Sequence, residues 1–185
     1  MHIHVTRTPL EGVLVIDTDF VRDERGFFVE SYHKQRFLEH GISDEFVQDN
    51  HSRSSQGVLR GLHYQDATAP MGKLVRCTEG EIFDVAVDLR ATSATAGQWF
   101  GIQLSGRNMT QMWIPSGFAH GFVTLSEHAD IQYKCTGYYT PSAEGTILWS
   151  DRDLAIDWPV ENPVLSVRDQ NGISWKAYLD RPAFS

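Results

Sequence analysis

Short runs of β-branched or alternating apolar and polar residues extend along most of the chain and predict strands. They cover residues 12–20, 73–77, 81–89, 98–104 and 112–115. In the run 81–89 (EIFDVAVDL), side chains of alternate residues point to opposite faces. Phe83 to Leu89 at odd positions then form a core face, and Asp84 and Asp88 lie on the other face.

Only one segment has a helical pattern that ends with a recognisable signal. It is Lys34–His40, and Gly41 follows it where a left-handed cap is expected. Many short strands without intervening helices favour an antiparallel β-sandwich or barrel, of which the jelly roll is one form. We expect an all-β chain with a few short helices, forming a single domain over residues 1–185, with residues 151–185 as a strand-poor closing segment.

Composition narrows the function classes. The chain has 185 residues, 41% of them apolar, and a formal net charge of −8, which argues against a general nucleic-acid binder. No stretch approaches the roughly 20 apolar residues of a membrane span, and no basic-then-apolar leader begins the chain. Cys77 and Cys135 lie in strand-like runs and are expected to be reduced thiols. These features predict a cytoplasmic protein without membrane partners.

His63 lies in the run 58–65 (VLRGLHYQ). On a regular strand, Arg60 would point to the opposite face, but Gly61 between them is typical of a bulge that redirects side chains. A hydrogen-bonded core histidine and a functional histidine are both consistent with this segment alone.

A second histidine follows a proline-glycine turn. The spacing of Pro115, Gly117 and His120 is similar to the second motif of the cupins. Metal-binding cupins also carry a His-x-His pair, and here Gln65 stands where its second histidine would be. We therefore expect no catalytic metal. Without a metal the histidines would transfer protons, and three acids are candidate partners: Asp84, Asp88 and Asp169.

Three further side chains have both a functional and a structural interpretation. Lys73 follows Gly72 at the start of a strand, where it would either stabilise an oxyanion or extend into solvent. Tyr133 would either donate a proton or pack in the core. Tyr139, beside Tyr138, would either stack on a base or pack against its neighbours.

Seven segments in order resemble the dTDP-4-dehydrorhamnose 3,5-epimerase family and together extend over roughly residues 8–170. They are residues 23–30 (DERGFFVE), 46–52 (FVQDNHS), 58–65, 72–76 (GKLVR), 81–90, 113–122 (WIPSGFAHGF) and 133–134. The resemblance implies a cupin-type jelly roll that forms a homodimer, uses no cofactor and inverts C3 and C5 of a 4-keto-6-deoxyhexose carried on dTDP.

The resemblance also implies a role for individual residues. His63 matches the base, with Asp169 as its carboxylate partner, while Tyr133 matches the opposing acid and Lys73 the group that stabilises the enolate oxygen. The expected substrate contacts are Gln48, Asn50, Arg60, Asp84, His120, Tyr139, Glu144 and Arg168, with Arg25, Phe28 and Glu30 on an arm that reaches into the partner's site.

Three alternative functions remain open. The nearest is a 3-epimerase that inverts one carbon with the same side chains. A metal-dependent cupin enzyme is disfavoured by Gln65. A cupin that binds a sugar without catalysis would not need His63 and Tyr133 together.

Overall fold

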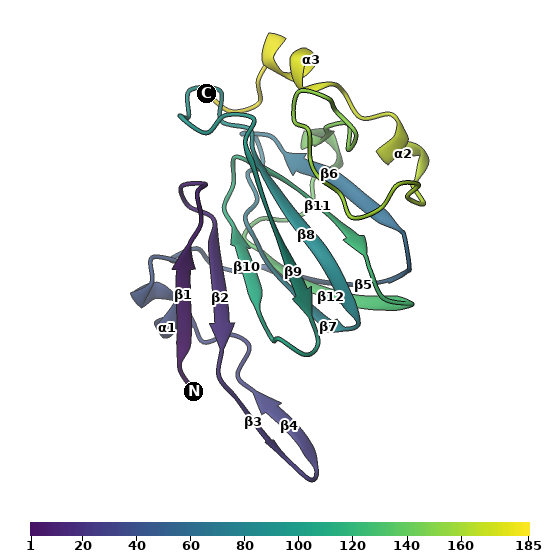
Figure 1. Cartoon of the computed structure of the whole chain (residues 1–185). Helices are drawn as coiled ribbons and strands as arrows, with labels where there is room; N and C mark the ends of the chain where they lie inside the picture. The colour runs from purple at the N-terminus through teal and green to yellow at the C-terminus, as the bar shows by residue number, and fades with distance from the viewer.

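The computed structural model describes all 185 residues and contains two main antiparallel sheets that face each other (Figure 1). The first sheet has six strands. In spatial order they are β1 (Ile3–Arg7), β2 (Leu14–Thr18), β10 (Gln111–Ile114), β7 (Lys73–Glu79), β12 (His128–Cys135) and β5 (Gln48–Ser55).

The second sheet has five strands. In spatial order they are β13 (Glu144–Thr146), β6 (Leu59–Gln65), β11 (Phe118–Thr124), β8 (Glu81–Asp88) and β9 (Trp99–Ser105). Neighbouring strands of both sheets pair in antiparallel register. The predicted all-β, cupin-type antiparallel sandwich is therefore confirmed.

Apolar side chains from both sheets fill the space between them. Val75 and Ile131 from the six-stranded sheet belong to the same buried cluster as Ala86, Phe118 and Phe122 from the five-stranded sheet. This cluster supports the cavity described below from one side, because burial of large apolar side chains fixes the separation of the sheets.

Strand β8 has the two faces that its alternation predicts, with Val85 and Val87 on one and Asp84 on the other, but both faces are buried. Val85 and Val87 pack under the C-terminal segment, against Trp158 and Trp175. The other face points between the sheets, and Asp84 there is fully buried. The pattern identified the strand but gave no sign that a later segment would cover it.

Helix α1 (Lys34–Glu39) agrees with the prediction and is followed by Gly41 at φ +86°. Its Phe37 is fully buried on the outer side of the six-stranded sheet, against Leu74 and Trp113. The C-terminal segment carries two further short helices, α2 (Val167–Gln170) and α3 (Trp175–Asp180), and a 3₁₀ turn lies at Pro141–Ala143. None of the helices has the length and hydrophobicity needed to span a bilayer.

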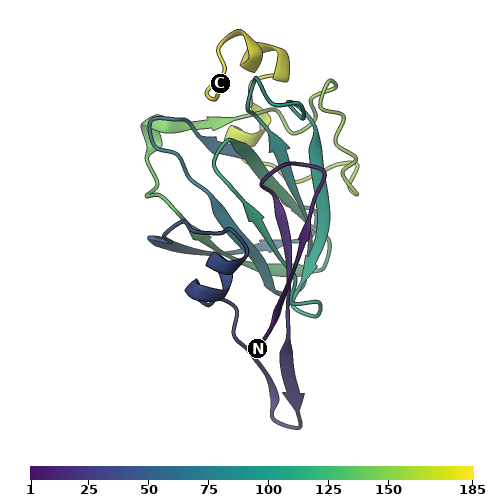
Figure 2. The same ribbon diagram turned by 90° about the vertical axis from the view of Figure 1, so that its left-hand side faces the viewer.

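A two-stranded hairpin projects from the body of the molecule (Figure 2). It consists of β3 (Phe20–Asp23) and β4 (Gly26–Val29). The single strand predicted over residues 12–20 is therefore two strands in different sheets. Hairpin side chains Phe27 and Phe28 are 54% and 68% exposed, although both are large and apolar.

Candidate active site

A cavity of about 500 Å³ opens between the two sheets. Its walls include His63 and His120 from the five-stranded sheet, Lys73 and Tyr133 from the six-stranded sheet, and Asp169 from α2. A second hollow of about 320 Å³ shares three of these residues and extends toward the loop after β12. The four predicted catalytic residues therefore come together in one place.

A local irregularity at Gly61 brings Arg60 and His63 into the same cavity. Gly61 has φ +140°, and a Cβ built on it would lie 2.5 Å from Gly121 Cα on the neighbouring strand. The register between β6 and β11 shifts at this point. The bulge anticipated from the sequence thus cancels the alternation that would separate the two side chains.

His63 is joined to a buried carboxylate. Its Nε2 lies 2.5 Å from Oδ1 of Asp169, which is 2% exposed. Ser166 caps α2 by accepting a bond from the Asp169 amide, and its hydroxyl donates to Asp169 Oδ2 at 2.7 Å. These contacts hold the carboxylate in place and assign the ring proton to Nε2, so that Nδ1 of His63 is the nitrogen that carries the lone pair.

The surroundings of His63 favour its neutral form. Desolvation lowers the pKa of His63, and the positive charges of Arg168 and Lys73 lower it further, against the opposing effect of Asp169. Burial would raise the pKa of Asp169, but hydrogen bonds from His63 and Ser166 outweigh it, and the pKa lies below its ordinary value. A neutral imidazole beside an ionised carboxylate is suited to act as a base.

Arg168 spans the site from α2 to β13. Its Nη2 lies 3.1 Å from Nδ1 and 2.8 Å from Nε2 of His63, and its Nη1 lies 2.7 Å from Glu144 Oε2. The guanidinium therefore contacts the histidine that the sequence identifies as the base. Nothing in the sequence pattern predicts this contact between Arg168 and His63.

Lys73 begins β7 and lines both hollows. Its ammonium group has no hydrogen bond or ion pair within the chain. Desolvation lowers the pKa of Lys73, while Cys135, Asp84 and Glu144 act in the opposite direction. A cation in a cavity with no internal partner is available to an anionic group of a ligand.

Tyr133 stands on β12, in the sheet that faces His63. Desolvation raises the pKa of its phenol, opposed by Asn50, its register partner on β5, and by Arg60. The proton therefore stays on the oxygen near neutral pH. The cavity thus has a neutral histidine on one sheet and a protonated phenol on the other.

The other two candidate acids have separate partners. Asp84 is bonded to His120, with 2.7 Å between Oδ1 and Nε2, and is therefore a histidine partner as predicted. Asp88 does not contact a histidine: it accepts bonds from Arg90, Ser93 and Thr95. The proposal of Asp88 as a histidine partner was therefore wrong, because its position at the end of β8 places it among loop residues instead.

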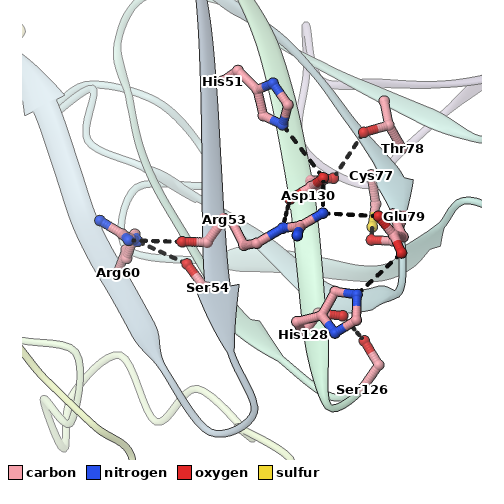
Figure 3. A network of polar contacts seen from close by, with 10 residues as sticks. All are labelled: His51, Arg53, Ser54, Arg60, Cys77, Thr78, Glu79, Ser126, His128 and Asp130. Atoms are coloured by element: carbon pink, nitrogen blue, oxygen red, sulfur yellow. Dashed lines mark hydrogen bonds and ion pairs between the residues drawn. The ribbon is translucent and has the colours of Figure 1, made fainter.

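Arg60 is oriented by strand β5. Its Nε donates to Ser54 Oγ at 3.0 Å, and its Nη2 lies 3.4 Å from the Arg53 carbonyl. The Arg53 side chain forms a separate cluster with Asp130 and Glu79, at 2.7 and 2.9 Å (Figure 3). Ser54 orients Arg60, and no sequence motif singles it out.

The predicted contacts around the second hollow form a chain of hydrogen bonds. Gln48 Nε2 donates to Asn50 Oδ1 at 3.1 Å, and Gln48 Oε1 accepts from the Tyr139 amide at 3.1 Å. The Tyr139 hydroxyl donates to Glu144 at 3.1 Å. The Tyr139 side chain is 51% exposed, so its ring is not a core residue.

The three predicted arm residues do not enter the cavity of their own chain. Arg25 pairs with Asp23 at the hairpin tip, Phe28 is exposed on β4, and Glu30 pairs with Arg36. Arg25 and Phe28 belong to the hairpin that projects from the body of the molecule (Figure 2), Glu30 directly follows it, and none of the three lines either hollow.

No group of three or more histidine, cysteine or acidic side chains has a geometry that would hold a metal ion. The two cavity histidines each engage a carboxylate through Nε2 instead. Gln65, at the position of a second metal ligand in the metal cupins, bonds to the backbone of two loops.

Comparison with known proteins agrees with this geometry. Residues 7–177 match the family model described as dTDP-4-dehydrorhamnose 3,5-epimerase. The chain belongs to the dTDP-4-dehydrorhamnose 3,5-epimerase family. Its members are epimerases, so the chain is an enzyme of the isomerase class.

Three relatives show the extent of the similarity. The family's enzyme from Salmonella typhimurium is 55% identical, over 89% of this chain and 91% of that protein. The enzyme from Pseudomonas aeruginosa is 53% identical, over 97% and 98%. A crystal structure of dTDP-6-deoxy-D-glucose-3,5-epimerase from Legionella pneumophila, in complex with dTDP-4-keto-L-rhamnose, superposes with a TM-score of 0.92 at 50% identity and covers 96% of this chain and 97% of that one.

Proposed function

We propose that this chain converts dTDP-4-dehydro-6-deoxy-D-glucose to dTDP-4-dehydro-L-rhamnose by inverting C3 and C5. The observation that carries the proposal is the meeting of His63, Asp169, Lys73 and Tyr133 around one cavity. Each group suits one part of an α-deprotonation beside a ketone. The family's relatives bear the name of this activity.

The base in this mechanism is His63. Its Nδ1 lone pair takes the proton from C3, and the electrons of the C–H bond move toward O4 to form an enolate. Asp169 holds the ring through Nε2 and stabilises the imidazolium that results. Lys73 stabilises the negative charge on O4, since its ammonium group has no other partner.

Inversion requires a proton from the other face of the sugar ring. Tyr133 supplies it from the facing sheet, and the enolate electrons form the new C3–H bond. The phenolate and the imidazolium then recover their original states by proton exchange with solvent. A repeat of the same steps at C5 completes the double inversion and needs no metal or nicotinamide.

The nucleotide extends from the first cavity into the second hollow in this proposal. Arg60 and Arg168 bind diphosphate oxygens, for which a guanidinium fork is well shaped. Tyr139 stacks on the thymine, with Gln48, Asn50 and Glu144 alongside. His120 and Asp84 lie at the sugar end. Arg60 and Arg168 thus bring positive charge to the nucleotide site although the chain has a formal net charge of −8.

We also propose that the enzyme acts as a homodimer. The β3–β4 hairpin exposes Val21, Phe27 and Phe28, and apolar groups of this size are stabilised by burial against a partner. In the dimer, Arg25, Phe28 and Glu30 reach the partner's cavity. Sedimentation should give twice the mass of one chain, and Phe27→Ser with Phe28→Ser should reduce it to one.

A cytoplasmic location completes the proposal. Both cysteines are free and buried, and unpaired thiols are typical of reducing compartments. Subcellular fractionation of the source cells, with an epimerase assay on each fraction, would test this location directly.

The decisive experiment incubates the purified chain with dTDP-4-dehydro-6-deoxy-D-glucose in deuterium oxide and follows label in the sugar. Label at C3 and C5 is the expected result. Label at C3 alone would instead support the 3-epimerase alternative, and label at neither carbon would rule out epimerisation. Activity that depends on a stoichiometric metal would support the metal-dependent cupin alternative.

The acid can be separated from the base in the same assay. Tyr133→Phe should retain exchange at C3 but slow the appearance of inverted sugar by about 10²-fold, within the usual contribution of a general acid. His63→Ala should abolish exchange at both carbons. Near-normal exchange in His63→Ala would show that another group is the base.

A further inference from the structure

We propose that Gln65 is a positioning residue that fixes the loop carrying Tyr139, and thereby sets the affinity of the enzyme for the nucleotide. The inference rests on the proposed function and adds a determinant of nucleotide binding to it. Gln65 ends β6, two residues after His63, and is 7% exposed.

The Gln65 amide joins two loops. Its Nε2 donates to the Tyr138 carbonyl at 3.2 Å and to the Ala69 carbonyl at 2.8 Å, and its Oε1 accepts from the Thr140 amide at 2.6 Å. Both amide hydrogens are therefore committed to backbone acceptors. Gln65 has no donor left for a ligand and must act through the loops that it holds.

A second glutamine, from the facing sheet, holds the same loop. Gln48 on β5 accepts a bond from the Tyr139 amide. The loop after β12 is thus tied by Gln65 on β6 and Gln48 on β5, one strand from each sheet. Three consecutive residues of the loop each have a backbone group bound by a glutamine side chain.

Apolar packing does little to hold this loop. The side chains of Tyr138 and Tyr139 are 69% and 51% exposed. Because the loop buries little apolar area, its conformation depends on its hydrogen bonds. Loss of a buried hydrogen-bond partner leaves a polar group without a partner, which costs free energy. Of the residues that form these hydrogen bonds, Gln65 is the buried one.

The position of the loop matters to the rest of the site. The Tyr139 hydroxyl donates to Glu144, Glu144 pairs with Arg168 at 2.7 Å, and Arg168 contacts His63. A loop that is free to move would present the Tyr139 ring to a base for only part of the time. Binding would then include the cost of ordering the loop. Once bound, the ligand holds the loop in place and restores the contacts from Tyr139 to Arg168, so the chemistry after binding would change little.

The test compares Gln65→Leu with the unaltered chain, using calorimetric titration with dTDP and steady-state kinetics. We expect the Kd for dTDP and the KM to rise on the order of 10-fold, as for the loss of one or two net hydrogen bonds, with kcat changed less than about twofold. Gln56→Leu is the matched control, because Gln56 donates to the Leu125 carbonyl at an exposed position. The control should bind dTDP normally.

A double-variant cycle identifies the route of the effect. If Gln65 acts through Tyr139, then Gln65→Leu should weaken dTDP binding far less in a Tyr139→Ala background than in the unaltered chain. Amide hydrogen exchange at Thr140 should also accelerate in Gln65→Leu, because its partner is removed. A purely structural loss of stability would change neither result selectively.

Several outcomes would overturn the inference. They are an unchanged Kd in Gln65→Leu, a loss of kcat at constant KM, or fully additive losses with Tyr139→Ala. If Gln65→Leu does not fold, Gln65→Met keeps the length of the side chain without its hydrogen bonds, and the same outcomes apply. Failure of the unaltered chain to bind dTDP would instead overturn the proposed function, and this inference with it.

Discussion

His63 and Asp169, 106 residues apart in the chain, meet with 2.5 Å between Nε2 and Oδ1. The first lies on a strand of the five-stranded sheet and the second on a four-residue helix of the C-terminal segment. The pair sets the tautomer of the imidazole, because Nε2 carries the proton that the carboxylate accepts. The basic atom is then Nδ1.

Replacement of the carboxylate should therefore impair the base. Asp169→Asn is expected to lower kcat by about 10²- to 10⁴-fold, since an amide neither holds the same tautomer nor stabilises an imidazolium. The measurement is single-turnover deuterium exchange at C3. Gln170→Ala, an exposed change on the same helix, is the control and should leave kcat within about twofold. A similar small effect from Asp169→Asn would contradict the assigned partnership.

The contact between Arg168 and His63 has a consequence for pH dependence. The Arg168 charge helps to keep the pKa of His63 below its ordinary value of 6.5. A base must be unprotonated, so kcat/KM should fall as pH drops through this lowered pKa. Arg168→Met removes the cation, raises the pKa of His63 and should move the acid limb of the kcat/KM profile to higher pH.

Arg60→Met is the matched variant for that profile. It also removes a cavity arginine, but its charge does not contribute to the shift at His63. Both variants should lose kcat/KM through weaker diphosphate binding, and only Arg168→Met should move the limb. A limb that stays in place in Arg168→Met would show that the contact does not tune the base.

Asp88 contributes to stability rather than to catalysis. Burial would raise its pKa, but bonds from Arg90, Ser93 and Thr95 outweigh it and lower the pKa from 3.8 to about 2. A depressed carboxyl pKa stabilises the folded state above the unfolded pKa, and this contribution disappears as pH falls through the folded pKa. The contribution is about 2 kcal/mol above pH 5, falls to less than about 0.5 kcal/mol at pH 2 and vanishes below that pH.

Urea unfolding of Asp88→Asn can test this contribution. The variant should be less stable than the unaltered chain by about 2 kcal/mol at pH 5, and the difference should shrink toward pH 2. Asp153→Asn, which removes the same charge at an exposed position, should change stability by less than about 0.5 kcal/mol. A difference that stays constant with pH would point to packing instead of charge.

Gly61 and Gly57 form a natural pair for testing the bulge in β6. Both have positive φ, +140° and +76°, but a Cβ at Gly61 meets Gly121 Cα at 2.5 Å whereas one at Gly57 meets nothing within 4 Å. Gly57→Ala should cost about 1 kcal/mol for backbone strain alone. Gly61→Ala should cost about 3 kcal/mol or more, from strain and overlap together, and should also lower kcat. Thermal and urea unfolding measure both, and equal losses would contradict the proposed clash.

The sequence predicted β7, β8, β9 and β10 but not β5, which is eight residues long and almost entirely polar (QDNHSRSS). Strands such as β8 contain eight residues, enough for alternation to show, whereas α2 contains four residues and cannot display a helical period. Ser166 three residues before Asp169 resembles a capping signal, and it was the one local sign of that helix. Burial of both faces of β8 depends on a distant segment, which no local pattern reports.

The site was predictable to a similar degree. His63 and Lys73 lie in recognisable motifs, and the anticipated irregularity at Gly61 is present. The contacts of Arg168, Ser54 and Gln65 depend on which segments meet in space, and side-chain direction there follows from bulges and loops. Asp88 was placed correctly on its strand, but its partner was not predicted, because it accepts hydrogen bonds from loop residues and not from a histidine.

The position of Asp169 in the last fifth of the chain bears on how the enzyme matures. The segment that carries it packs over the five-stranded sheet through Trp158, Trp175 and Tyr178, and it supplies one wall of the cavity. During translation, Asp169 is therefore synthesised after all the strands of both sheets. In the proposed mechanism, proton transfer by the His63–Asp169 pair therefore requires that this C-terminal layer has docked over the sheets.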